Sequence, residues 1–258
     1  MANLAAHNGS VTGWGLTGIF AANATETRFE RLRFIGNGSG GAGLGDGLAV
    51  GAGGQISHCL AKGNSAAGFN ALGLVAIDHC LAVANTADGI AVADASSVAD
   101  CTLQLNAGNG IATGAKCRVT DCVVTGATLD GIHAGTNTTI RGCTVSECGG
   151  DGIEVAAQCR VTDNQCNNNG QLTSFGAGIR LTGVRNHVEA NTCMNNDYGF
   201  NVVGSYNILI RNVAAKNNTG STSDNYQIAA FATLYGSIHS LSSSAVETNT
   251  LANLSSPF

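Results

Sequence analysis

Apolar and polar residues alternate over short segments along most of the chain. Ile132 and Ala134 flank His133, and Ile153 and Val155 flank Glu154, so that every second side chain shares one face. Two further segments follow within each repeat, the second marked by Val119, Ile140 and Val161, and the third by Val124, Val145 and Cys166. Segments this short, separated by Gly and by Asn or Asp turns, predict β-strands and exclude long helices.

A glycine followed by an apolar residue recurs at a nearly constant interval. The pairs are Gly18-Ile19, Gly47-Leu48, Gly68-Phe69, Gly89-Ile90, Gly110-Ile111, Gly131-Ile132, Gly152-Ile153, Gly178-Ile179 and Gly199-Phe200, and Gln227-Ile228 continues the series. Most successive pairs are separated by the same number of residues. The longer intervals from Gly18 to Gly47 and from Gly152 to Gly178 accommodate inserted loops.

Such a short repeat indicates a solenoid. Three strands in each repeat predict an all-β, right-handed parallel β-helix of about ten coils over residues 1–228. Residues 229–258 lose the repeat, and we expect them to form a tail that packs on or caps the helix.

The cysteines follow the same interval. Five of the ten recur once per repeat, and asparagines occupy the same column in later coils: Cys59, Cys80, Cys101, Cys122, Cys143, Asn164, Asn191 and Asn212. This pattern favours a bend whose side chain turns inward, where Asn stacks through amide hydrogen bonds and Cys acts as a small apolar residue. In-register neighbours lie about 4.8 Å apart, too far for an unstrained disulfide. Buried free thiols are therefore expected, with a disulfide or a metal as alternatives.

Composition and charge narrow the function classes. The net charge is −5 and only 11% of residues are charged, which argues against a nucleic-acid partner because phosphate binding needs clustered Lys and Arg. No apolar run approaches the ~18 residues of a membrane span. The sequence shows no signal peptide in the given chain, so the location of the protein stays open.

The repeat resembles a known group. The pattern I-x-D-C/N-x-V-x-x-N-x-x-D-G-I, the opening NGSVTGWGLTGI and the ending TLANLSSPF are similar to bacterial right-handed parallel β-helix repeat proteins of the pectate-lyase-like superfamily. This resemblance implies a polysaccharide or glycan partner and a secreted or cell-surface protein. It also implies polysaccharide lyase or glycoside hydrolase-like chemistry if the chain is an enzyme. No complete catalytic set stands in the sequence, so catalysis is left undecided.

The outward row after each Gly-apolar pair changes character along the chain. It is mostly small in the early coils and becomes His133, Glu154, Arg180 and Asn201 in coils six to nine. We expect a groove at coils six to eight, in which Arg180 pairs with a carboxylate and His133 or Glu154 transfers a proton. Asp130 and Asp151 precede the same strands, and Gln171 and Phe175 lie in the inserted loop 167–178, so these residues and Asn201 are candidate substrate-binding residues. A solvated ion-pair face is the alternative.

The sequence predicts no resident metal or other cofactor. One column of side chains with oxygen atoms nevertheless allows a calcium site as an alternative. Asp46, Asp88, Asp130 and Asp151, with Asn109, recur at the turn before the strand. Carboxylates in a column can bind calcium. Asp-Gly is also ordinary turn chemistry, and the turn is the favoured interpretation.

A second outward row is apolar. Leu60, Leu81 and Val123, with Val83, form a stripe on coils three to six, and exposed apolar stripes are usually covered. The cover is either the chain's own tail or another subunit. Two functions are therefore carried forward: a polysaccharide-binding or polysaccharide-processing β-helix, and a non-catalytic structural or adhesive repeat protein that self-associates through this apolar face.

Overall fold

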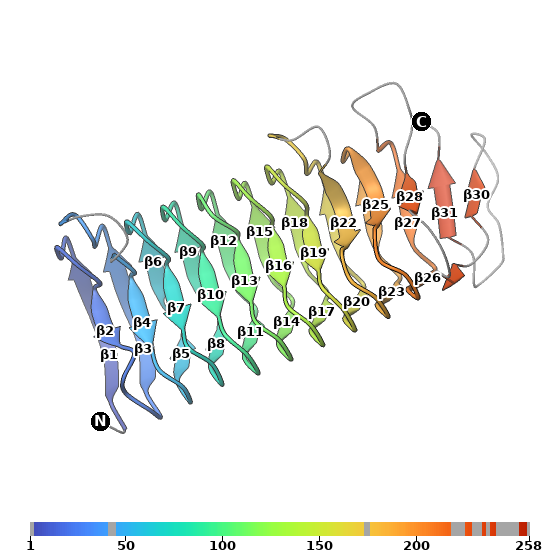
Figure 1. Ribbon diagram of the computed structural model, residues 1–258. Coiled ribbons are helices and arrows are strands. Elements are labelled where there is room, and N and C mark those ends of the chain that lie inside the picture. The colour runs from blue at the N-terminus through green and yellow to red at the C-terminus, as the bar shows by residue number, and fades with distance from the viewer. Residues whose placement is uncertain are drawn as a thin grey trace.

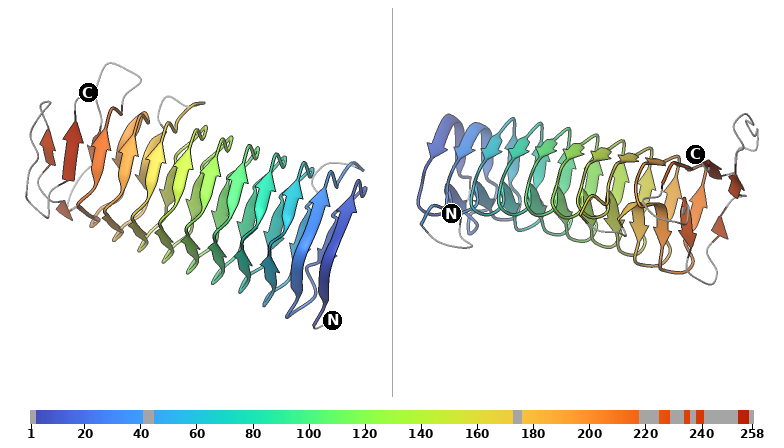
Figure 2. Two further views of the ribbon diagram at one scale, coloured as in Figure 1. Left: turned by 180° about the vertical axis from the view of Figure 1, so that it is seen from behind. Right: turned by 90° about the horizontal axis from the view of Figure 1, so that it is seen from above.

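The chain winds into a stack of parallel coils whose strands run side by side from one end to the other (Figure 1). The computed structural model describes residues 3–40, 45–172, 176–217, 225–228, 234–235, 238–240 and 253–256. Within these ranges every regular element is a β-strand, and no helix has the length and hydropathy of a membrane span. The first sheet holds ten strands paired in chain order, one per coil, which confirms the predicted parallel β-helix. Figure 2 shows the same stack from behind and from above, with the termini at opposite ends.

The first sheet follows the glycine repeat and carries the outward row that contains His133. Its strands are β2 (Ile19–Ala21), β4 (Leu48–Val50), β7 (Phe69–Ala71), β10 (Ile90–Val92), β13 (Ile111–Thr113), β16 (Ile132–Ala134), β19 (Ile153–Val155), β22 (Ala177–Leu181), β25 (Tyr198–Val202) and β28 (Tyr226–Ile228). Ile111, Ile132 and Ile153 pair in register across β13, β16 and β19. Residues one repeat apart therefore stack on one another.

The second and third strands of each coil belong to a sheet of 21 strands. The second strands are β5 (Gln55–Ser57), β8 (Ala76–Asp78), β11 (Ser97–Ala99), β14 (Arg118–Thr120), β17 (Thr139–Arg141), β20 (Arg160–Thr162), β23 (His187–Glu189) and β26 (Ile208–Ile210). The third strands are β6 (Leu60–Lys62), β9 (Leu81–Val83), β12 (Thr102–Gln104), β15 (Val123–Thr125), β18 (Thr144–Ser146), β21 (Gln165–Asn167), β24 (Thr192–Met194) and β27 (Val213–Ala215). At the N-terminal end, β1 (Ala5–Thr12) pairs with β3 (Arg28–Ile35), which is long enough to pair with both β5 and β6.

Three short strands of the tail continue this sheet at the C-terminal end. They are β29 (Leu234–Tyr235), β30 (Ile238–Ser240) and β31 (Asn253–Ser256). β29 pairs with β26, and β31 pairs with both β27 and β30. Most of the tail lies outside the described residues, so its predicted role as a packing or capping segment stays a prediction.

The bend between the second and third strands explains the cysteine column. One residue with positive φ makes the turn, as in Asp121 (53°) and Asp163 (59°), while Gly142 (68°) takes the same place in the coil between them. The next residue, Cys122 or Asn164 in these coils, then points inward and is 0% or 1% exposed. The predicted inward column is confirmed, and all ten cysteines of the chain are buried and free.

The core consists of the inward side chains of all three strand columns. Ile132, Ile140 and Val145 come from the three strands of one coil, and each is 0% exposed. Fully burying such a side chain contributes roughly 1.5–3 kcal/mol, and the contribution repeats in every coil. The inward side chains thus form the core, and residues that bind or react must lie in the outward rows.

Candidate functional site

A hollow of about 520 Å³ lies on the outer face of the first sheet, over coils five to eight. We call it the His133 hollow. The residues that line it are Asn109, Thr128, Leu129, Asp130, His133, Gly150, Asp151, Glu154, Gly176 and Arg180. These residues come from the outward row of the sheet and from the turns that precede its strands.

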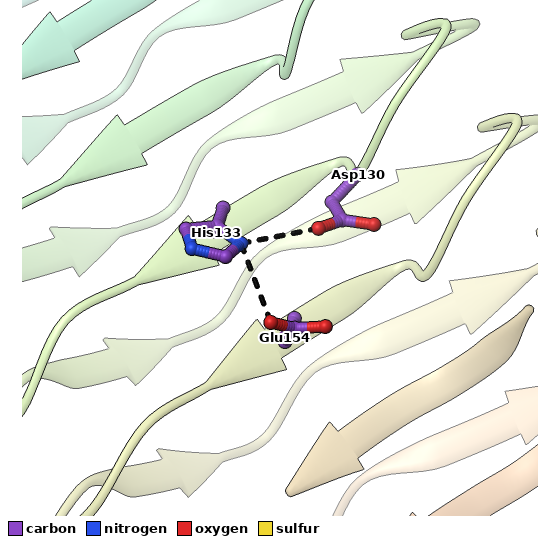
Figure 3. A group of neighbouring side chains, drawn as sticks. All are labelled: Asp130, His133 and Glu154. Atoms are coloured by element: carbon purple, nitrogen blue, oxygen red, sulfur yellow. Dashed lines mark hydrogen bonds and ion pairs between the residues drawn. The ribbon is translucent and has the colours of Figure 1, made fainter. Parts of the chain in front are cut away.

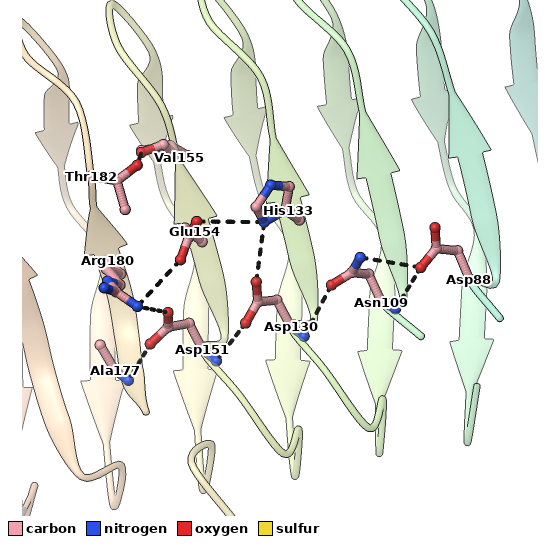
Figure 4. A network of polar contacts seen from close by, with 10 residues as sticks. All are labelled: Asp88, Asn109, Asp130, His133, Asp151, Glu154, Val155, Ala177, Arg180 and Thr182. Carbon is pink, nitrogen blue, oxygen red and sulfur yellow. Dashed lines mark hydrogen bonds and ion pairs between the residues drawn. The ribbon is translucent and has the colours of Figure 1, made fainter. Parts of the chain in front are cut away.

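The strand register places the three predicted chemical groups next to one another. His133 on β16 is paired with Glu154 on β19, and Glu154 is paired with Arg180 on β22. The step from Glu154 to Arg180 is longer than the usual repeat, but the loop inserted before β22 takes up the excess and leaves the register intact. The three side chains therefore form the line that the sequence predicts (Figure 4).

A chain of ionic contacts joins this line to two aspartates. His133 Nδ1 lies 3.2 Å from Asp130 Oδ2 and 3.6 Å from Glu154 Oε1. Arg180 Nη1 lies 3.5 Å from both Glu154 Oε2 and Asp151 Oδ2. Glu154 thus stands between a cation and an imidazole (Figure 4). The Nε–H of Arg180 is buried and has no acceptor among the described residues, so the guanidinium keeps an unmet donor.

The aspartates are held by a ladder of hydrogen bonds along the turns. Asn109 N–H donates to Asp88 Oδ1 at 2.6 Å, and Asp130 N–H donates to Asn109 Oδ1 at 3.1 Å. Asp151 N–H donates to Asp130 Oδ1 at 2.8 Å, and Ala177 N–H donates to Asp151 Oδ1 at 2.6 Å. One oxygen of Asp130 and one of Asp151 therefore fix the backbone, while the other faces the His133 hollow (Figure 4). The turn interpretation of this column thus has a specific structural basis.

Two pKa values in the His133 hollow depart from their usual range. The hydrogen bond to Asp130 raises the pKa of His133, with the negative charge of Glu154 adding to it, although partial burial acts the other way. Burial raises the pKa of Asp151 to about 7, against the opposing effects of the Ala177 amide and of Arg180. The raised pKa of Asp151 brings its proton exchange close to neutral pH, where a group is well placed for general acid-base chemistry.

The same residues offer a set of metal-ligating atoms. Asp130, His133 and Glu154 each provide one such atom, and these atoms all lie within 4.8 Å of one another (Figure 3). An imidazole with two carboxylates suits a divalent transition metal better than calcium, which takes six to eight oxygen ligands. Arg180 lies 3.5 Å from Glu154 and would compete with a cation for that carboxylate.

Two of the other predicted binding residues, Asn201 and Gln171, are not among those that line the His133 hollow. Asn201 on β25 is the register neighbour of Arg180 but is not among the lining residues. Gln171 is exposed, and its Nε2 donates to the carbonyl of Asn168 within its own loop at 2.9 Å. Phe175 falls outside the described residues. Asp46 lies at the N-terminal end of the column, where its carboxylate accepts hydrogen bonds from the backbone of Ala67 and the side chain of Asn70.

Apart from glycines, the sequence interpretation missed two residues of the hollow rim. Thr128 and Leu129 line the His133 hollow, and Leu129 is 53% exposed. They occupy the turn before Asp130, where the position of Leu129 is filled by small residues such as Ala87, Gly108 and Gly150 in the neighbouring repeats. A leucine in a turn of otherwise small residues is the signal that could have identified this position.

Fold and site together define the chain as a right-handed parallel β-helix with a hollow on the outer face of one sheet that several ionisable side chains line. The sequence matches the family model described as "Right handed beta helix region" over residues 2–137 and 112–255. The chain therefore belongs to this right-handed β-helix family. The sequence matches none of the curated proteins with which it was compared.

Several solved structures share the fold. The periplasmic alginate epimerase AlgG is similar with a TM-score of 0.67 at 14% identity, over 96% of this chain and 68% of that chain. The A-module of the Azotobacter vinelandii mannuronan C-5 epimerase AlgE4 gives 0.60 at 15% identity, over 87% of this chain and 75% of that chain. Pectate lyase Pel9A gives 0.55 at 11% identity, over 90% and 68%. At these identities the likeness shows the fold.

Proposed function

We propose that the chain binds a polysaccharide of uronic acids across the His133 hollow and acts on it by proton transfer. The observation that carries this proposal is the line of His133, Glu154 and Arg180 on three adjacent strands, in which the Glu154 carboxylate lies 3.6 Å from the imidazole on one side and 3.5 Å from the guanidinium on the other. A uronate offers a carboxylate for the guanidinium and, on the neighbouring carbon, a proton for the base.

Arg180 pairs with the carboxylate of the bound sugar in this scheme. Its positive charge stabilises the negative charge that develops on the carboxyl group when the neighbouring carbon loses its proton. His133 in its neutral form accepts that proton, and Asp130 orients the imidazole through Nδ1. The electron pair then either expels the glycosidic oxygen, which takes a proton from water and completes an elimination, or takes a proton from water on the opposite face, which is epimerisation.

The solved structures of similar fold support this substrate class. Two of those described above are an alginate epimerase and a mannuronan epimerase, and the third is a pectate lyase. Their polymers carry carboxylates, as the Arg180 position requires. The alginate epimerase AlgG is periplasmic, which supports a place outside the cytoplasm for this chain too.

The test combines binding and reaction. Short oligomers of polygalacturonate and of alginate are incubated with the protein, and calorimetry, the absorbance of an unsaturated product and proton NMR of the sugar are recorded. We expect binding by the wild type, at least tenfold weaker binding for Arg180→Gln, and binding without reaction for His133→Ala. Arg185→Gln removes an exposed arginine outside the His133 hollow and serves as the matched control. Equal affinity of wild type and Arg180→Gln would contradict the proposal.

Self-association is the second candidate function, and the exposure of its residues favours it. Leu81 is 37% exposed and Val123 43% exposed, and both stand in the outward row of the third strands together with Leu60. Val83 lies on the same strand as Leu81. Sedimentation of the wild type and of a Leu81→Ser/Val123→Thr variant tests this function. A concentration-dependent oligomer that the variant abolishes would support it, and a monomeric wild type would dismiss it.

A further inference from the structure

A second hollow, of about 460 Å³, lies on the sheet of 21 strands and is rich in arginine. We call it the arginine groove. It is lined by Arg118, Arg141, Arg160 and Arg211, by Thr120, Thr139 and Thr162, and by Asp163, Glu189 and Ala190. None of these residues belongs to the His133 hollow.

The coil register brings these residues together from distant parts of the sequence. Arg118 and Arg160 stand in one outward row with Thr139 between them. Arg141 stands in the adjacent outward row between Thr120 and Thr162. Arginine and threonine therefore alternate in both rows across β14, β17 and β20. Arg211 joins them from the bend after β26, where its φ is 55°.

The groove is positive although the chain is acidic. Four arginines face two carboxylates here, in a chain that has 12 Lys and Arg residues and a net charge of −5. Glu189 pairs with Arg160 at 3.6 Å and with Arg211, and Asp163 lies 3.6 Å from Arg141. No ion pair of Arg118 occurs within the described part of the chain.

The guanidinium groups remain accessible. The side chains of Arg141, Arg160 and Arg211 are 68%, 58% and 53% exposed. The Arg141–Asp163 pair is exposed on both sides and contributes at most about 1 kcal/mol, so it competes weakly with an incoming anion, whereas Glu189 is only 12% exposed and neutralises part of the charge of Arg160 and Arg211. Burial, followed by the charges of Arg160 and Arg211, lowers the pKa of His187, which agrees with a positive potential at this end of the groove.

We propose that the arginine groove binds a linear polysaccharide that carries carboxylate or sulfate groups, independently of the His133 hollow. The cations are distributed along the axis of the β-helix, with Arg118 and Arg160 two strand spacings or roughly 10 Å apart. A small anion contacts one or two of them, whereas a chain with regularly repeated anions contacts all four and gains from multivalency.

The side-chain chemistry favours a sugar polymer over a nucleic acid. Guanidinium groups bind carboxylate and sulfate oxygens with paired hydrogen bonds, and the threonine hydroxyls can bind sugar hydroxyls. Single-stranded nucleic acid is held largely by stacking of its bases on aromatic side chains. No aromatic residue is among those that line the groove.

The direct test measures the affinity for dextran sulfate, which offers no uronate to the His133 hollow, with neutral dextran as the blank. The wild type binds the charged polymer, more weakly as salt rises, and the Arg118→Gln/Arg160→Gln variant binds at least tenfold more weakly. Arg28→Gln is the matched control, because Arg28 heads the same outward row through Gln55, Ala76 and Ser97 but lies outside the groove. If the double variant does not fold, the same affinities are measured with Arg118→Gln alone. This substitution breaks no ion pair among the described residues.

The location of binding is read from two histidines by NMR. His187 is the register neighbour of Arg160, whereas His133 lies in the other hollow. Dextran sulfate in the arginine groove shifts the imidazole signals of His187 and leaves those of His133 in place, whether or not the His133 hollow acts on uronates. Unchanged affinity of the double variant, unmoved His187 signals, or tighter binding of a single-stranded oligonucleotide of equal charge would each overturn the proposal.

Discussion

Asp130 Oδ1 accepts a hydrogen bond from the backbone N–H of Asp151 on the next coil, at 2.8 Å. The other oxygen of Asp130 contacts His133 at 3.2 Å. One carboxylate therefore connects the stacking of coils to the chemistry of the His133 hollow. The hydrogen bond that stacks two coils thus also fixes the carboxylate beside His133, and pre-organisation of this kind favours binding and catalysis.

The pKa of His133 tests this connection. Asp130→Asn keeps an oxygen that can accept from Asp151 N–H but removes the negative charge beside the imidazole. We expect the pKa of His133 to fall toward its ordinary value, because the Asp130 hydrogen bond is the main cause of its rise. An NMR titration of the imidazole measures this. Asp88→Asn, two coils away in the same column, should change the His133 pKa much less, and an equal effect of the two variants would refute the assignment.

Asp151 makes stability depend on pH. Its pKa is about 7 in the folded protein and 3.8 in the reference state, so the folded state binds this proton more tightly than the unfolded state does. The contribution to the free energy of unfolding is thus fully present at pH 4 and below, and it is lost as the pH rises toward 7, by on the order of a few kcal/mol. His133, whose pKa is also raised, acts in the same direction over a higher range. Asp130, Glu154 and Arg180 are the charges that face Asp151.

Urea unfolding at pH 5 and pH 8 checks this expectation. The wild type should lose more stability between the two values than Asp151→Asn does, because the amide does not ionise. If both proteins lose the same amount, Asp151 does not hold its proton as inferred.

Substitution of a single buried asparagine in the inward column should lower the stability of the protein markedly. Asn191 Nδ2 donates to the carbonyl of Val161 and to Asn212 Oδ1, while its Oδ1 accepts from Asn164. Asn191→Ala leaves buried partners unsatisfied and should lower the free energy of unfolding by about 3 kcal/mol. Asn191→Cys should cost less, since cysteine fills the same column in earlier coils. Denaturant melts of both variants decide this, and a larger loss for Cys than for Ala would be inconsistent with a shared column.

The hydrogen bonds of the acidic column at the turns predict how calcium affects the melting temperature. The carboxylates of Asp88, Asp130 and Asp151 each accept a backbone N–H from the following coil, so the column is satisfied by hydrogen bonds within the protein. We expect the melting temperature in EDTA to equal that in millimolar calcium. A clear rise of Tm with calcium would show that these oxygens bind the ion, because a ligand of the folded state raises Tm.

The coils could be predicted from the sequence because the residues that form them recur at a regular interval. Apolar residues such as Ile132 and Ile153 recur at the interval at which their strands stack, and Cys122 and Cys143 recur at the bend. The line from His133 to Arg180 could be predicted even across the longer step before β22, since a loop adds length without changing the register of the strands.

The arginine groove could not be predicted in the same way. Arg118 and Arg160 share a row, but Arg141 belongs to the adjacent row and Arg211 to a bend, so no single column of the repeat displays the cluster. The raised pKa of Asp151 was equally hidden. It depends on the burial of this one carboxyl group in the folded chain, whereas Asp130 in the preceding coil is half-buried.

The most direct test of the proposed function is a titration of a galacturonate oligomer into the protein, read at the imidazole of His133. Bound carboxylate beside Arg180 should shift the His133 signals, and the shift should vanish in Arg180→Gln at the same oligomer concentration. His133 signals that stay in place while the oligomer binds elsewhere would contradict the account, and the polysaccharide would then belong to another face of the β-helix.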